Sequence, residues 1–239
     1  MNKVFCIIIL IIFQINCFKK CDSFKNSTTK IYGIDVSQYQ DKLAKINWET
    51  VATKNNPTIS FAYIRTTMGK DGRDTSFQYN FNSAKKHGIK VGVYHYYRPN
   101  ENSTEQFENF SKHNQDIGDL APVLDIEENS VFGIKNLRAE IQNFLNLMEK
   151  KYHKKPIIYA HQRFYNTYLR NKFPDYEIWI ARQNGFQNPP DNNLMKKEPI
   201  LFDIKCPLIW QYSGTGNIQG INGAVDLNIT TESIWSEDR

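Results

Sequence analysis

Four acidic side chains lie in short apolar runs of this chain, where solvated charges are not expected: Asp35, Asp125, Glu127 and Asp226. Burying an unpaired carboxylate costs free energy, so a fold that gathers several of them needs a functional reason. Cleavage of a glycosidic bond is one such reason, because it requires a proton donor and at least one ionised partner around a sugar.

Asp125 and Glu127 stand two residues apart at the end of one apolar run. In a strand, residues i and i+2 point to the same face, with a rise of roughly 6–7 Å between them. Mutual repulsion and partial burial raise the pKa of one such carboxyl. One group then stays protonated as a general acid while the other stays ionised. A metal-binding or solvated pair remains an alternative at this point.

Asp35 and Asp226 belong to the first and last strand candidates, which become neighbours if a barrel closes. Both carboxylates would then lie near the site that contains Asp125 and Glu127. Two local alternatives stay open. Asp35 could cap a turn with Ser37, and Asp226 could form an Asx-turn with Asn228.

Aromatic and polar residues frame the same predicted strand ends. Sugars present apolar C–H faces and hydroxyl rims, which rings and hydrogen-bonding side chains can contact. Our candidates for substrate contact are Tyr94, Tyr96, Arg65, Gln211, Tyr212, Gln38 and Arg182. Packing inside the fold is the alternative for some aromatic residues, above all Tyr97 and Trp179.

Strand-like and helix-like segments alternate from about residue 31 onward. The predicted strands are 31–37, 61–67, 90–97, 122–127, 156–161, 177–182, 208–213 and 224–229. The predicted helices are 77–87, 103–116, 134–152 and 163–171, the second with Ser103 as its N-cap and Gln106 completing a capping box. Residues 183–207 are rich in Asn, Pro and Lys and predict a long loop.

This pattern predicts an α/β fold: a modified TIM-like (β/α) barrel of about eight strands and about five helices, irregular in its last third. We expect the strands to be parallel and each of the four acids to lie late in its strand. Function in such a barrel collects at the C-terminal strand ends. An open doubly wound sheet is the alternative architecture.

The 239 residues are divided into a leader (1–20), a short linker (21–30) and one catalytic domain (31–239). A basic start and an apolar stretch over 4–18 predict an export signal, and hence a secreted, periplasmic or cell-envelope protein. An uncleaved N-terminal anchor and lipid attachment at Cys17 are alternatives. Cys21 and Cys206 could form one disulfide, or both could be free.

Charge and spacing argue against several classes of partner. Without the leader's three lysines, 27 basic residues face 25 acidic ones, a net charge of +2 that is too balanced for a nucleic-acid binder. The five histidines are scattered and no Cys/His spacing suits zinc, so we expect no metal site. We expect a monomer with no stable membrane span in its mature form.

Five motifs, Gly33–Gln40, Gly92–Pro99, Pro122–Glu127, Trp210–Tyr212 and Val225–Asn228, resemble those of the glycoside hydrolase family 25 muramidases. The resemblance runs from about residue 32 to residue 229. It implies hydrolysis of the β-1,4 bond between N-acetylmuramic acid and N-acetylglucosamine in peptidoglycan glycan strands. It also implies a modified barrel with fewer than eight helices, and no cofactor.

The same resemblance implies a role for each acid. Glu127 matches the general acid/base, and Asp125 matches the carboxylate that orients or stabilises the 2-acetamido group of the substrate. Asp35 and Asp226 match the flanking acids that tune Glu127 and hold the reacting sugar. The resemblance favours retention of configuration with substrate assistance, although a direct attack by water remains open.

The chain departs from the family pattern in three places. Met68 stands where many relatives carry Glu, Tyr39 replaces a commoner Trp, and Glu128 adds an acid beside the pair. Two other functions also stay open. One is a catalytically silent glycan-binding protein on the same fold, and the other is a hydrolase of another amino-sugar polymer such as chitin.

Overall fold

The computed structural model describes residues 24, 27–183, 197–203, 205–231 and 234. Nine strands form a single sheet: β1 (Ile31–Val36), β2 (Ile59–Met68), β3 (Gly72–Arg73), β4 (Lys90–Tyr96), β5 (Val123–Asp125), β6 (Ile157–His161), β7 (Glu177–Ala181), β8 (Ile209–Gly216) and β9 (Val225–Thr230). Their order is β1-β9-β8-β7-β6-β5-β4-β2-β3, and a further pairing of β1 with β2 closes eight of them into a barrel. The predicted closed barrel is therefore confirmed, and the open sheet is excluded.

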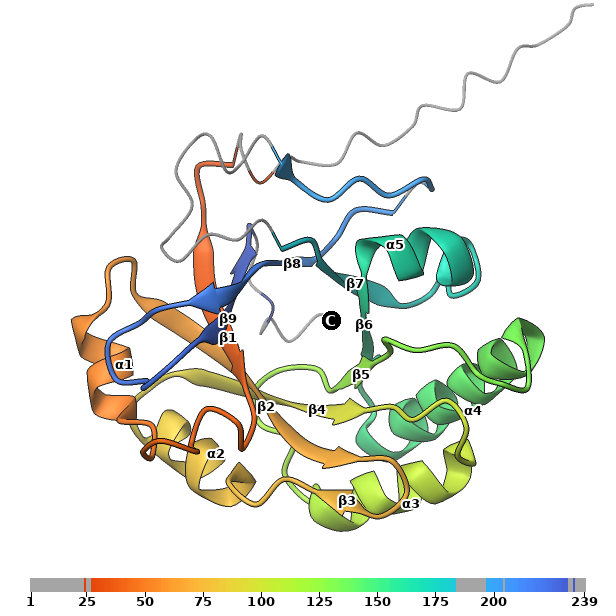
Figure 1. Cartoon of the computed structure of the whole chain (residues 1–239), viewed down its shortest axis with the longest axis horizontal. Helices are drawn as coiled ribbons and strands as arrows, with labels where there is room; N and C mark the ends of the chain where they lie inside the picture. The colour runs from red at the N-terminus through yellow and green to blue at the C-terminus, as the bar shows by residue number, and fades with distance from the viewer. Residues whose placement is uncertain (1–23, 25–26, 184–196, 204, 232–233, 235–239) are drawn as a thin grey trace, which may run out of the picture.

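Five α-helices cover the barrel: α1 (Trp48–Lys54), α2 (Phe77–Lys86), α3 (Ser103–His113), α4 (Ile134–Tyr152) and α5 (Gln162–Phe164), which continues into a π-helical turn (Tyr165–Leu169). Figure 1 shows them outside the ring of strands, from α1 at the left, through α2 and α3 below, to α4 and α5 at the right. In the described part of the chain, β8 and β9 are joined to their neighbours without helices. The last third is thus irregular, as the sequence predicted.

Alternation along the strands divides the apolar side chains into two layers. The outer layer packs against the helices and includes Ile64, Val93 and Ile158. The inner layer fills the lower part of the barrel and includes Tyr63 and Val123. Because successive strand residues face opposite sides, every second residue after an inner one also faces the barrel interior. Arg65 and Asp125 follow the inner residues Tyr63 and Val123 by two positions, and both line the cavity at the barrel mouth.

Strand β9 is antiparallel to both β1 and β8, whereas the other neighbouring barrel strands are parallel. The prediction of an all-parallel barrel is therefore wrong for this strand. Asp226 is the second residue of β9 and not late in its strand. Since β9 runs the other way, its start lies at the barrel end where the parallel strands finish. Asp226 consequently pairs with Asp35 across the two strands.

Several local predictions need correction. Helix α1 was not predicted, and β5 ends at Asp125, so Glu127 lies just beyond the strand. The predicted N-cap of α3 is also wrong. The cap is Asn102, whose side chain accepts hydrogen bonds from two backbone amides of the first turn. Gln106 contacts the backbone of Arg98 instead of closing a capping box.

The predicted leader and Cys21 lie outside the described residues, as does most of the predicted loop 183–207. Cys206 is disulfide-bonded, so it is not the free thiol that the sequence left open. None of the helices in the described ranges has the length and apolar character that crossing a membrane requires.

Candidate active site

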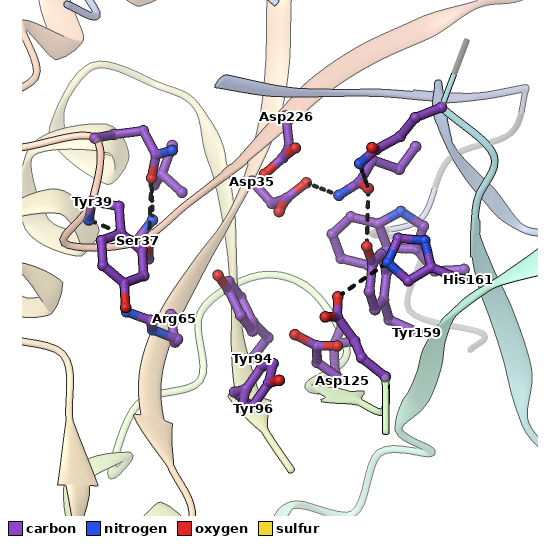
Figure 2. Close-up of a pocket in the computed structure, with 17 residues that line it drawn as sticks. Asp35, Ser37, Tyr39, Arg65, Tyr94, Tyr96, Asp125, Tyr159, His161 and Asp226 are labelled. Carbon is purple, nitrogen blue, oxygen red and sulfur yellow. Dashed lines mark hydrogen bonds and ion pairs between the residues drawn. The ribbon is translucent and has the colours of Figure 1, made fainter. Parts of the chain in front are cut away.

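A cavity of about 330 Å³ opens at the barrel mouth, at the carboxyl ends of the parallel strands. Figure 2 shows labelled side chains from several strands turned toward its centre. The lining residues are Asp35, Val36, Ser37, Tyr39, Gln40, Arg65, Tyr94, Tyr96, Val123, Asp125, Glu127, Tyr159, His161, Trp179, Gln183, Gln211 and Asp226. All four acids singled out in the sequence are in this set, so the fold gathers them as predicted.

Asp35 is buried but well supplied with hydrogen bonds. Its Oδ2 accepts from Nε2 of Gln211 at 3.0 Å and from Nδ2 of Asn228 at 2.7 Å. Burial raises the pKa of Asp35 to about 6, and the two amide donors oppose this rise because they stabilise the charged form. The turn cap considered for Asp35 is not formed, since the backbone amide of Ser37 is bonded to Gln40.

Asp226 lies beside Asp35, as Figure 2 shows, and its Asx-turn with Asn228 is not formed because both residues are in β9. Burial, together with the charges of Asp35 and Glu127, raises the pKa of Asp226 to about 8. This carboxyl can therefore keep a proton at neutral pH.

Asp125 is 7% exposed, and its Oδ1 has no hydrogen-bond partner among the described residues. Burial raises the pKa of Asp125 well above its ordinary value, and the charges of Glu127 and Asp35 add to the effect. The guanidinium of Arg65 acts in the opposite direction. A buried acceptor without a donor indicates a place where a ligand can supply one.

Glu127 is partly exposed, with 31% of its side chain accessible, whereas Asp35 and Asp125 are buried. Burial raises its pKa above the ordinary value, and the charge of His161 lowers it. Glu128 raises the pKa of Glu127, whereas the hydroxyl of Tyr159 lowers it. A partly exposed carboxyl with a raised pKa can both hold a proton and deliver it to a ligand in the cavity.

Arg65 supplies the buried positive charge of the site. Its Nε lies 3.1 Å from Oδ2 of Asp74, and the two side chains are 8% and 1% exposed. The guanidinium also lies 5.0 Å from the ring centre of Tyr39. Asp74 further accepts the backbone amides of Gln38 and Ser76, so the ion pair fixes the loop that follows β1.

The raised pKa values predict how stability depends on pH. In the unfolded chain Asp35 and Asp226 ionise near their ordinary value of 3.8, but in the folded protein they ionise near 6 and 8. Between about pH 4 and about pH 8 the folded protein therefore binds more protons than the unfolded chain does. The free energy of unfolding consequently falls as the pH rises through this window. Urea unfolding of Asp226→Asn should show a smaller fall over this window than the wild type shows. A wild-type stability that is lost as pH drops through this window would contradict the prediction.

The predicted substrate contacts divide into two groups. Tyr94, Tyr96, Arg65 and Gln211 line the cavity together with the acids. The other three lie elsewhere: Tyr212 is buried in the outer layer, Gln38 accepts from Thr75, and Arg182 donates to the backbone of Glu198. Sugar contact by these three has no support in the geometry. Of the two residues expected to pack, Tyr97 is buried outside the cavity, whereas Trp179 is buried but also lines it.

Sequence reasoning missed three functional candidates: Asn228, Tyr159 and His161. Asn228 connects Nε1 of Trp179 to Asp35, and Tyr159 donates to Gln211, which itself holds Asp35. His161, at the end of β6, lies 3.6 Å from Glu127. Strand alternation could have found them, since Asn228 follows Asp226 by two positions, and His161 follows Tyr159 by two.

Comparison with known proteins identifies relatives of the whole barrel. The family described as "Glycosyl hydrolases family 25" matches residues 34–221. The uncharacterized protein YegX of Escherichia coli K12 is 35% identical over 202 residues, which cover 83% of this chain and 69% of YegX. Lysozyme M1 of Streptomyces globisporus is 31% identical over 218 residues, or 84% of this chain and 68% of the lysozyme.

Among solved structures, a family 25 glycosyl hydrolase from Bacillus anthracis superimposes with a TM-score of 0.68 at 27% identity. The alignment covers 86% of this chain and 90% of that one. The barrel described above is therefore the modified TIM-like fold of that family. Within the described residues, no group of three or more His, Cys, Asp or Glu side chains is arranged to hold a metal ion.

Proposed function

This chain belongs to glycosyl hydrolases family 25, and we propose on that basis that it hydrolyses the β-1,4 bond between N-acetylmuramic acid and N-acetylglucosamine in peptidoglycan. The observation that carries the proposal is the convergence of Asp35, Asp125, Glu127 and Asp226 on one open cavity. Similarity to lysozyme M1 supports the choice of substrate.

Glu127 is the proton donor in this reaction. It combines a raised pKa with a partly exposed side chain that lines the cavity. It protonates the oxygen that leaves the anomeric carbon, and the bond between that carbon and oxygen breaks. The positive charge that develops on the sugar is stabilised by the anions around it.

Asp125 directs the 2-acetamido group of the sugar. Its buried Oδ1 needs a donor, and the N–H of an acetamido group supplies one. The acetamido oxygen then attacks the anomeric carbon as the leaving oxygen departs. In the second step Glu127, now ionised, takes a proton from the water that opens the cyclic intermediate. The product keeps the configuration of the substrate.

Asp35 and Asp226 complete the group of acidic side chains around the reacting sugar. Asp35 is held by Gln211 and Asn228, so its position is fixed before substrate arrives. Asp226 keeps a proton near neutral pH and can donate a hydrogen bond as well as accept one. The rings of Tyr94 and Tyr96 provide apolar surface for the sugar faces.

Mass analysis of the released fragments tests the substrate and the bond. Purified peptidoglycan treated with the protein should yield fragments that end in N-acetylmuramic acid at the new reducing end. New ends of N-acetylglucosamine would contradict the proposed bond. Cleavage of chitin without cleavage of peptidoglycan would show that chitin is the substrate. Cleavage of neither would favour a silent glycan-binding protein.

Peptidoglycan lies outside the cytoplasmic membrane, so the activity requires export. The leader of residues 1–20 serves this purpose in our proposal, either as a cleaved signal or with lipid attachment at Cys17. Mass analysis of the mature protein, expressed with its own leader, distinguishes the two. A full-length product retained inside the cell would contradict export.

A further inference from the structure

His161 is the only described histidine within ion-pair distance of a carboxylate in the candidate active site. Its Nε2 lies 3.6 Å from Oε1 of Glu127, and Figure 2 marks this contact with a dashed line. The mechanism above gives His161 no task. A titratable side chain beside the proton donor nevertheless affects when that donor carries its proton.

The position of His161 beside Glu127 follows from the barrel strands. It is the last residue of β6, and the inner residue Tyr159 lies two positions before it. Strand β6 pairs with β5, which ends at Asp125, so the ends of β5 and β6 bring His161 next to Glu127. The ring centres of Tyr159 and His161 are 6.2 Å apart in an edge-on contact, and the His161 side chain is 47% exposed.

The charged neighbours of Glu127 divide by sign. Glu128 on its own segment raises its pKa, and Glu127 in turn interacts with Asp125, Asp35 and Asp226 from β5, β1 and β9. Tyr96 of β4 and Tyr159 of β6 also face it, and both are neutral hydroxyls in the working pH range. Among the groups shown to act on Glu127, His161 is the one that can carry a positive charge.

We propose that His161 is a positioning residue that pairs with Glu127 and sets the pH range over which this carboxyl holds the proton it delivers to the glycosidic oxygen. The inference rests on the proposed function. A protonated imidazole stabilises the carboxylate that remains after proton delivery, so it makes Glu127 a stronger acid. The same charge makes Glu127 lose its proton at a lower pH, which brings the alkaline limit of activity down.

The pH profile of kcat/KM on a soluble glycan fragment of peptidoglycan tests this coupling. His161→Gln removes the titratable charge and keeps a polar side chain, so its alkaline limb should move up by roughly half a pH unit or more. His161→Lys keeps a fixed positive charge, and its limb should lie below that of His161→Gln. His87→Gln is the control, because His87 ends α2 and lies outside the cavity. If the alkaline limbs of the pH profiles coincide for the wild type and His161→Gln, the inference is overturned.

A second measurement does not depend on turnover. At a fixed pH, the NMR signals of the His161 imidazole should shift in Glu127→Gln relative to the wild type, because the carboxylate 3.6 Å from its Nε2 is gone. The signals of His87 should be the same in both proteins. An unchanged His161 signal would overturn the pairing even if the enzyme is active. A wild type that cleaves no peptidoglycan would instead refute the proposed function, and the NMR comparison would still decide the pairing.

Discussion

Replacement of Glu127 by Gln is expected to lower kcat/KM on peptidoglycan by about 10²–10⁴-fold, the contribution of a general acid. The amide keeps nearly the shape of the carboxyl but has no proton to give to the leaving oxygen. Turbidity clearing of a peptidoglycan suspension and single-turnover rates on a soluble fragment both measure the loss. Substrate binding should change far less than turnover, because the side chain still lines the same cavity.

Glu128→Gln is the matched control for this variant. Glu128 is the next residue and also a carboxylate, but it is exposed and accepts a hydrogen bond from the hydroxyl of Tyr96 at 3.1 Å. The amide oxygen of Gln can accept the same bond, so most of the activity should remain. If Glu127→Gln clears peptidoglycan as fast as the wild type does, Glu127 is not the acid. Melting temperatures of both variants show whether any loss is a folding effect.

Replacement of Asp74 by Ala is expected to reduce the free energy of unfolding by about 3–5 kcal/mol, as removal of one partner from a buried ion pair does. The change leaves the guanidinium of Arg65 without its carboxylate and two loop amides without their acceptor. Chemical denaturation monitored by tryptophan fluorescence gives the value. Activity should fall as well, because Arg65 and the loop after β1 both border the cavity.

Lys70→Ala is the control for the ion pair, because it removes a partner from a solvated pair. The ammonium of Lys70 lies 3.4 Å from Glu105, and the two side chains are 50% and 55% exposed. Such a surface pair contributes about 0–1 kcal/mol. If Asp74→Ala and Lys70→Ala lower the free energy of unfolding equally, the buried ion pair with Arg65 contributes no more to stability than a surface pair does.

The barrel and its acid cluster could be predicted because both depend on local patterns. Short apolar segments separated by helical ones predict a (β/α) barrel. The two-residue spacing of Asp125 and Glu127 predicts that both face one site, and both line the cavity although Glu127 lies beyond β5. The bounds of α4 were predicted to the residue, since its apolar stripe is continuous from Ile134 to Tyr152. The carboxylates also led to the hypothesis of chemistry on a sugar, which stays a prediction.

Other features depend on contacts between distant segments. That His161 faces Glu127 follows from the pairing of β6 with β5, which neither segment encodes alone. The direction of β9 was missed although a signal existed. Only residues 217–224 separate it from β8, and a parallel crossover needs about a dozen residues or more. Tyr212 was misplaced because its neighbour Gln211 is the residue of that motif that lines the cavity.

Strand β9 both closes the barrel and completes the candidate site. Asp226 and Asn228 follow the other residues of the site along the chain, and β9 must insert between β1 and β8 before Asn228 can donate to Asp35. A polypeptide interrupted before this strand has neither the full set of acids nor a closed ring, and its two unpaired sheet edges invite association with other chains. We therefore expect a chain truncated before β9 to lack hydrolytic activity and to be prone to aggregation.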